Sequence, residues 1–124
     1  MDKFLCLTFS GVAGTLARYL LSGVIYQRFG VDFPYGTLVV NLIGCFLIGF
    51  FDSLIQDRFL LSPQLRLLLM TGFCGAFTTF STFILETSNL FKDGEPVRAL
   101  LNVLISVIAG FLIFRLGVAL GKFI

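Results

Sequence analysis

The chain contains no histidine and no tryptophan, and only 13% of its 124 residues are charged. The absence of histidine removes the usual activator of a nucleophilic serine such as Ser81, and no paired carboxylates converge, so we do not expect an enzyme. A proton relay needs titratable side chains deep in a membrane, and these are scarce here. Cys6, Cys45 and Cys74 lie in apolar segments without paired spacing, which argues against a disulfide framework or a metal centre.

The scarcity of charge also separates the chain from soluble proteins, in which about 25% of residues are charged. Its net charge of +2 is small and scattered, which argues against nucleic-acid binding. Apolar residues make up 57% of the chain, in runs long enough to cross a bilayer, which takes roughly 20 residues. We predict an all-α integral membrane protein, a single domain over residues 1–124, with spans at residues 4–26, 35–55, 65–91 and 97–123.

Positive charges are almost evenly divided between the two sides of the predicted bundle. With four spans, both termini and the link between spans two and three share one side. The first side carries Lys3, Arg58, Arg66 and Lys122, and the second carries Arg28, Lys92 and Arg98. Orientation normally follows a clear cytoplasmic excess of Lys and Arg. The balance therefore predicts dual topology, which permits an antiparallel pair of identical chains.

The third span contains a stretch unlike an ordinary membrane helix. Residues 72–83 combine two glycines, four hydroxyl residues and four phenylalanines. Glycine weakens a helix, and serine and threonine can bond nearby backbone groups in place of the helical ladder, so we predict a break near residues 72–79. Freed backbone groups in a membrane must line a cavity or lie inside protein, so a break indicates a site. The alternative is a seam of small residues that only packs against another helix.

The remaining spans carry polar or small residues at every third or fourth position, which places them on one helix face. The stripes comprise Gly14, Arg18 and Ser22 in the first span, Thr37, Asn41 and Gly44 in the second, and Arg98, Asn102, Ser106 and Gly110 in the fourth. In the fourth span, Gly117 and Gly121 also have the spacing that lets helices approach closely.

The chemistry of these stripes suits an ion. Hydroxyl and amide groups can serve cations through oxygen or anions through hydrogen, and the deep Arg18 favours anions. Arg18 could instead snorkel to the interface, and Asn41 could act only as a hydrogen bond between helices. Phenylalanine edges carry partial positive charge and can contact an anion, although phenylalanine more often only packs. The residues alone leave these alternatives open.

Three segments resemble the motifs of the Fluc/CrcB family of fluoride channels. They are residues 11–19 (GVAGTLARY), 36–44 (GTLVVNLIG) and 72–83 (GFCGAFTTFSTF). The resemblance extends to the length, the four spans and the balanced links, and it implies an antiparallel dual-topology homodimer with two fluoride pathways. It also implies passive fluoride export through the bacterial cytoplasmic (inner) membrane, with fluoride, lipid and a second copy of the chain as partners.

The same resemblance assigns roles to individual positions. Phe80 and Phe83 match the paired phenylalanines whose edges line the pathway, and Arg18 matches the arginine of its vestibule. The implied pathway residues are Arg18, Thr37, Asn41, Phe80, Ser81, Thr82, Phe83, Glu86, Asn102 and Ser106. The backbone carbonyls of Gly75 and Thr78 match those that hold a structural sodium ion, the implied cofactor, at the dimer centre.

Two other functions remain as alternatives. A small dual-topology multidrug exporter needs a membrane-embedded glutamate in its first span, and residues 4–26 contain no acid. A non-transporting membrane assembly factor would use glycine and phenylalanine only for packing. It would therefore tolerate conservative apolar replacement of Asn41, Phe80 and Phe83.

Overall fold

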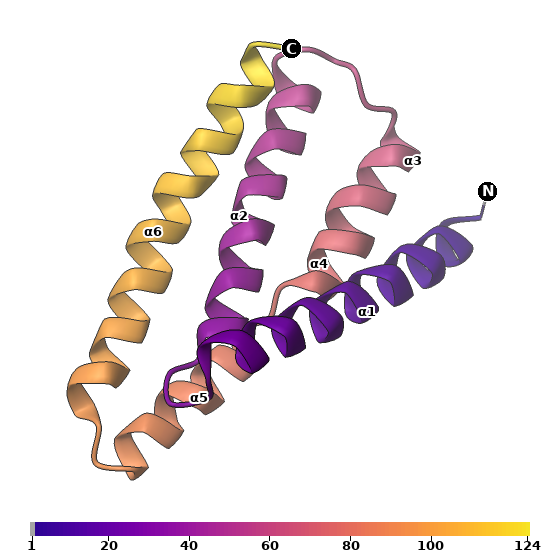
Figure 1. Cartoon of the computed structure of the whole chain (residues 1–124). Coiled ribbons are helices and arrows are strands. Elements are labelled where there is room, and N and C mark those ends of the chain that lie inside the picture. The colour runs from indigo at the N-terminus through magenta and orange to yellow at the C-terminus, as the bar shows by residue number, and fades with distance from the viewer. Residues whose placement is uncertain (1) are drawn as a thin grey trace.

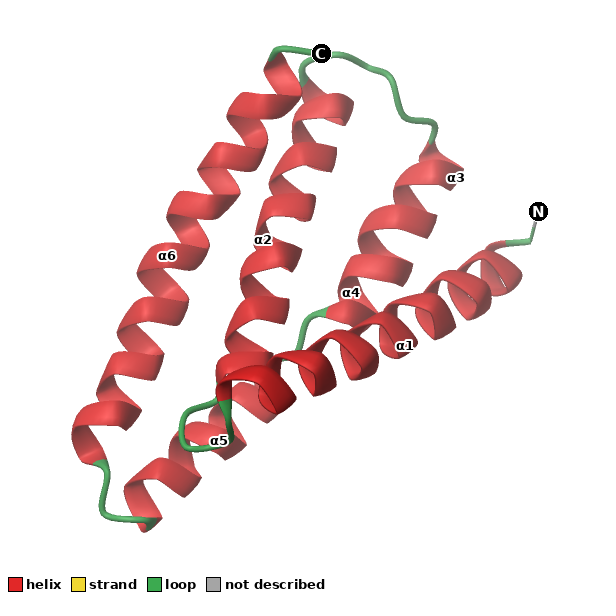
Figure 2. Ribbon diagram, viewed as in Figure 1, coloured by secondary structure: helices red, strands yellow, loops and turns green. Residues whose placement is uncertain are grey.

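The computed structural model describes residues 2–124, and within this range the chain forms helices and loops without strands (Figure 2). Helical spans long and apolar enough to cross a membrane occur at Lys3–Phe29, Tyr35–Gln56, Pro63–Lys92 and Pro96–Lys122. Each agrees with a predicted span to within a few residues, so the predicted four-span fold is confirmed.

Three of the spans are continuous helices, whereas the third is assembled from pieces (Figure 1). The continuous helices are α1 (Lys3–Phe29), α2 (Tyr35–Gln56) and α6 (Pro96–Lys122). The third span consists of α3 (Pro63–Arg66), the π-helix η1 (Leu67–Cys74), α4 (Gly75–Phe77) and, after an interruption, α5 (Phe80–Lys92).

The interruption of the third span is confined to Thr78 and Thr79. Thr78 has φ −86° and ψ 157°, and Thr79 has φ −149° and ψ 120°, so both are extended. Gly75 keeps helical angles, φ −63° and ψ −35°, and Gly72 lies inside η1. The predicted break is confirmed, but it is narrower than expected, and hydroxyl residues rather than glycines form it.

Gly72 in the third span and Gly14 in α1 allow these two helices to pack closely. A Cβ atom on Gly72 would overlap Ser10 Oγ, and one on Gly14 would overlap the Phe73 carbonyl oxygen. Close approach of backbones is the usual reason for small residues in membrane helices. For Gly72, therefore, the packing seam is the correct interpretation.

A second seam joins α2 and α6, which run side by side in the same direction (Figure 1). A Cβ atom on Gly117 would overlap the Phe46 carbonyl oxygen, and one on Gly121 would lie 2.7 Å from Ser53 Cβ. The predicted close approach at Gly117 and Gly121 is thus found against α2.

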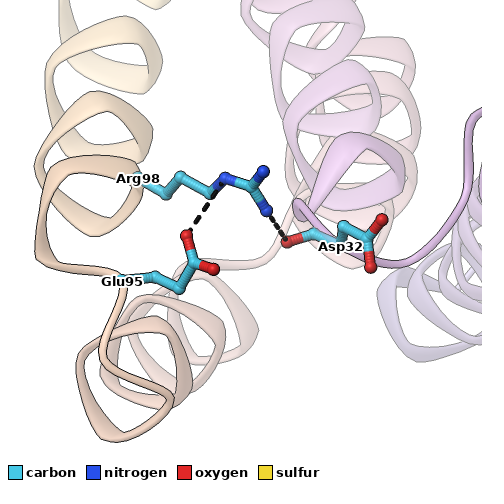
Figure 3. A network of polar contacts seen from close by, with 3 residues as sticks. All are labelled: Asp32, Glu95 and Arg98. Carbon is cyan, nitrogen blue, oxygen red and sulfur yellow. Dashed lines mark hydrogen bonds and ion pairs between the residues drawn. The ribbon is translucent and has the colours of Figure 1, made fainter.

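Both termini lie at the end of the bundle that holds the α2–α3 loop, as an even number of spans requires (Figure 1). At that end, Arg58 Nη2 donates to the Lys122 carbonyl at 2.9 Å. At the opposite end, Arg98 donates through Nη1 to the Asp32 carbonyl at 3.4 Å and forms an ion pair with Glu95 at 3.1 Å (Figure 3). Each arginine therefore ties an interhelical loop to an end of α6.

Candidate functional site

The centre of the site is a pair of hydrogen bonds between Asn41 on α2 and the interrupted backbone. Asn41 Nδ2 donates to the Thr79 carbonyl at 3.0 Å, and the Thr79 N–H donates to Asn41 Oδ1 at 2.9 Å. The amide thus takes the place of the missing helical partners at the break. A primary amide carries two hydrogens, and this pair uses one, so the other is available to a further acceptor.

Threonine hydroxyls complete the ends of the interrupted helices. Thr78 Oγ1 donates to the Cys74 carbonyl at 2.9 Å, at the end of α4. Thr79 Oγ1 accepts from the Thr82 N–H at 3.3 Å and donates to Thr82 Oγ1 at 3.0 Å, so Thr79 is the N-cap of α5. The TTxxT sequence of residues 78–82 therefore encodes one helix end and one helix start.

These contacts release two backbone carbonyls. In an uninterrupted helix, the Thr79 N–H would donate to the Gly75 carbonyl and the Thr82 N–H to the Thr78 carbonyl. Here the Thr79 N–H donates to Asn41 and the Thr82 N–H to Thr79 Oγ1. Within residues 2–124 no cluster of three His, Cys, Asp or Glu side chains could hold a metal. A cation at this place would therefore have to use carbonyl oxygens such as those of Gly75 and Thr78.

A second polar group surrounds the Glu86 carboxylate on α5. Tyr26 Oη, from α1, donates to Glu86 Oε2 at 2.9 Å, and Thr37 Oγ1, from α2, donates to Glu86 Oε1. Tyr26 Oη lies 3.3 Å from Thr37 Oγ1 and accepts the Thr37 N–H at 3.4 Å. Three helices therefore meet at one carboxylate through hydroxyl groups.

Two adjoining hollows collect most of the predicted pathway residues. The inner hollow, of about 270 Å³, is lined by residues that include Arg18, Thr37, Thr82 and Glu86. The aromatic hollow, of about 320 Å³, is lined by residues that include Asn41, Phe80, Phe83 and Ser106. Thr79 lines both hollows, so they meet at the break.

The two phenylalanines of the aromatic hollow are in different surroundings. Phe83 is 7% exposed, whereas Phe80 is 74% exposed. Their ring centroids lie 5.8 Å apart, with 52° between the ring planes. One side of the hollow is therefore open in a single chain, and Phe80 lies at that side.

Two predicted pathway residues lie outside both hollows. Ser81 is exposed on α5. Asn102 on α6 is 1% exposed, and its Nδ2 donates to Thr87 Oγ1 at 2.9 Å. Thr87 in turn donates to the Phe83 carbonyl at 2.7 Å, so Asn102 joins α6 to α5 directly behind Phe83.

Tyr26, Thr79 and Thr87 are missing from the predicted site. For Tyr26 a signal is present, because it follows Gly14, Arg18 and Ser22 at the same spacing of four. For Thr79 the signal is its place before Phe80, where a hydroxyl residue can cap a new helix. Nothing in the sequence distinguishes Thr87 from any other threonine in a membrane helix.

Comparison with known proteins finds a matching family model and relatives that span nearly the whole chain. A family model described as "CrcB-like protein, Camphor Resistance (CrcB)" matches residues 5–118. A Maridesulfovibrio salexigens protein named "Fluoride-specific ion channel FluC" is 46% identical over 124 residues, which cover 100% of this chain and 98% of that protein. Proteins of the same name from Solidesulfovibrio magneticus and Chlorobium phaeobacteroides are both 47% identical. The first matches over 124 residues (100% of this chain, 99% of that protein), the second over 112 (90% and 87%).

Proposed function

The chain belongs to the CrcB family, and on this premise we propose that it is a fluoride-selective channel that lets fluoride leave the bacterial cytoplasm passively. It is a multi-pass protein of the inner membrane and not an enzyme. The observation that carries the proposed pathway is that two hollows share Thr79 as a lining residue, and Thr79 is paired with Asn41 at the break. Membrane interiors offer no water to polar groups, so a run of such groups through the bundle is suited to an ion.

The donors along the hollows can replace the water around fluoride in steps. Thr82 offers a hydroxyl, Asn41 offers its remaining amide hydrogen, and Phe83 offers a ring edge of partial positive charge. Arg18, half-buried beside the inner hollow, attracts an anion towards it. Moving one charge across the membrane changes its energy by about 2.3 kcal/mol per 100 mV. A negative interior therefore expels fluoride without a pump.

The functional unit in this proposal is an antiparallel homodimer with two pathways. Phe80, Ser81 and Gly75 are exposed although they lie in the middle of a membrane span. A second copy against this side would cover them and close the aromatic hollow. The nearly equal division of Lys and Arg between the two ends supports insertion in both orientations.

The released carbonyls support a structural sodium ion at the centre of this dimer. Gly75 and Thr78 would hold it, each contributing a backbone oxygen in both copies. Carbonyl oxygens are suitable ligands for a monovalent cation in a membrane protein. When bound, the ion would neutralise partial charge on backbone that a membrane otherwise leaves unsatisfied.

Sodium dependence of stability tests this part of the proposal. We expect the purified dimer to unfold at a lower temperature when sodium is replaced by N-methylglucamine, because the released carbonyls then lose their partner. Restoring sodium should restore the unfolding temperature, and potassium at equal ionic strength serves as the control. Equal unfolding temperatures in all three salts would contradict a sodium site.

Ion release from liposomes tests the channel itself. Vesicles reconstituted with this chain alone are loaded with fluoride or with chloride, and an ion-selective electrode follows release. We expect rapid release of fluoride only, and loss of that release in Phe80→Ile, with Phe123→Ile as a control near the C-terminus, where the ring is 86% exposed. Folded protein that releases no fluoride would refute the proposed function, and an unaffected Phe80→Ile would favour a packing role.

A further inference from the structure

Tyr26 lies at a partition between two hollows. A third hollow, the outer hollow of about 370 Å³, lies beside the α1–α2 loop and is lined by residues that include Asp32 and Asp93. Tyr26 and Glu86 are the residues that line both the outer and the inner hollow. Since these two side chains are joined at 2.9 Å, their hydrogen bond separates the outer hollow from the inner one.

The tyrosine ring is held in place by α2. A Cβ atom on Gly36 would lie 2.7 Å from Tyr26 Cδ2, so the ring rests on bare backbone at that position. The Thr37 N–H then donates to Tyr26 Oη at 3.4 Å. Ring packing and backbone donor together fix the position of the phenol oxygen, as a site with defined geometry requires.

The hydrogens at the partition are fully engaged by the carboxylate. A hydroxyl group has one hydrogen, and both Tyr26 and Thr37 give theirs to Glu86. An anion that moves between the outer and inner hollows must pass this place, where the carboxylate repels it. It can do so only if the hydroxyl groups turn away from the carboxylate and donate to the anion instead. Hydrogen bonds from a hydroxyl to an ionised acceptor are stronger than those between neutral groups.

We propose that Tyr26 is a pathway residue whose hydroxyl alternates between the Glu86 carboxylate and fluoride as the ion crosses from one hollow to the other. The inference rests on the proposed function, and it adds a residue of α1 that the family motif of residues 11–19 does not include. The outer hollow thereby becomes the mouth of the pathway at the α1–α2 loop.

Unitary fluoride current in planar bilayers tests the role of Tyr26. Current per channel does not depend on how much protein folds, so it separates conduction from stability. Tyr26→Phe keeps the ring against Gly36 and removes the hydroxyl, and we expect its unitary current to fall about tenfold. Tyr35→Phe is the matched control, because its ring packs on Phe29 and Phe33 outside the three hollows of the pathway.

The outcomes separate this inference from the proposed function. An unsubstituted chain that carries no fluoride current would overturn both. A conducting chain whose Tyr26→Phe variant carries an equal or larger current would overturn the role of Tyr26 alone. Should Tyr26→Phe fail to form a folded dimer, Thr37→Val removes the other hydroxyl hydrogen of the partition with little change in shape. It must also lower the unitary current, and an unchanged current would overturn the inference as well.

Discussion

Asn41 combines two roles that can look like alternatives from its sequence position alone. Its amide exchanges two hydrogen bonds with Thr79, so it does join helices as a membrane asparagine often does. It also lines the aromatic hollow with one amide hydrogen to spare. The same side chain therefore holds the break open and, in the proposed pathway, offers a donor to fluoride.

Replacing Asn41 by aspartate should stop fluoride conduction. A carboxylate can still accept from the Thr79 N–H, but it has no hydrogen for the Thr79 carbonyl, and it places negative charge in an anion pathway. We expect loss of fluoride release from liposomes and a loss of stability of about 1–3 kcal/mol from the unpaired carbonyl. Thermal unfolding in detergent measures the second effect.

Gln56→Glu is the control for this change. It makes the same conversion of amide to acid on the same helix, at an exposed end. It should conduct and unfold as the unsubstituted chain does. Fluoride release at the normal rate from Asn41→Asp would contradict the role given to Asn41.

Sequence reasoning found the residues of the site better than their contacts. Sequence reasoning placed Thr37 and Asn41 on a polar helix face through their regular spacing, and it added Thr82 through the family resemblance. It did not identify Tyr26, although the spacing of four included it, because an aromatic residue near a span end is usually an interface anchor. The partner of Asn41 is a backbone group, and no sequence pattern identifies the backbone atom that a distant side chain will bond.

At the scale of whole elements, the third span shows how side chains replace part of the backbone hydrogen bonding of an interrupted membrane helix. Side chains on the span itself, Thr78 and Thr79, and on a neighbouring helix, Asn41, take over the bonds. The existence of a break could be predicted from the composition of residues 72–83. Its position at residues 78 and 79 could not, because glycine supports both irregular backbone and close packing, and only tertiary contacts decide which applies.

The Gly44→Ala variant tests how closely α2 must pack against the interrupted backbone. A Cβ atom there would overlap Thr78 Cγ2, so Gly44→Ala must push α2 away from the interrupted backbone. We expect a loss of stability of about 1–3 kcal/mol, as overpacking usually causes, and slower fluoride release. Unfolding temperature and efflux are the two measurements.

Gly23→Ala supplies the comparison for Gly44→Ala. Nothing lies within 4 Å of a Cβ at Gly23, so this alanine should leave release unchanged and raise helix stability by up to about 1 kcal/mol. If Gly44→Ala behaved like Gly23→Ala, α2 would not need to contact the break closely.

At the scale of the whole molecule, one chain forms the four-span bundle but leaves part of the site uncovered. Long apolar runs predicted the spans because membrane thickness fixes their length. The proposed antiparallel pair rests instead on the small difference between the numbers of positive charges at the two ends of the bundle. The exposure of Phe80 and Gly75 in mid-membrane agrees with a partner on that side.

Labelling from one side of the membrane tests dual topology. Phe123→Cys is introduced into a chain whose native cysteines are replaced by serine or alanine, and intact inverted vesicles are treated with an impermeant maleimide. Because the charge bias is weak, we expect about half of the chains to react. Labelling of nearly all or nearly none of the chains would contradict dual topology, and detergent-opened vesicles give the total.

The most direct test of the channel is the reversal potential with fluoride on one side of a planar bilayer and an equal concentration of chloride on the other. A selective pathway should shift this potential towards fluoride equilibrium by about 59 mV for each tenfold preference. We predict a shift beyond about 118 mV, which corresponds to a hundredfold preference or more. A reversal potential near zero would mean that both anions pass equally, and it would contradict a fluoride-selective pathway through the hollows at Asn41 and Thr79.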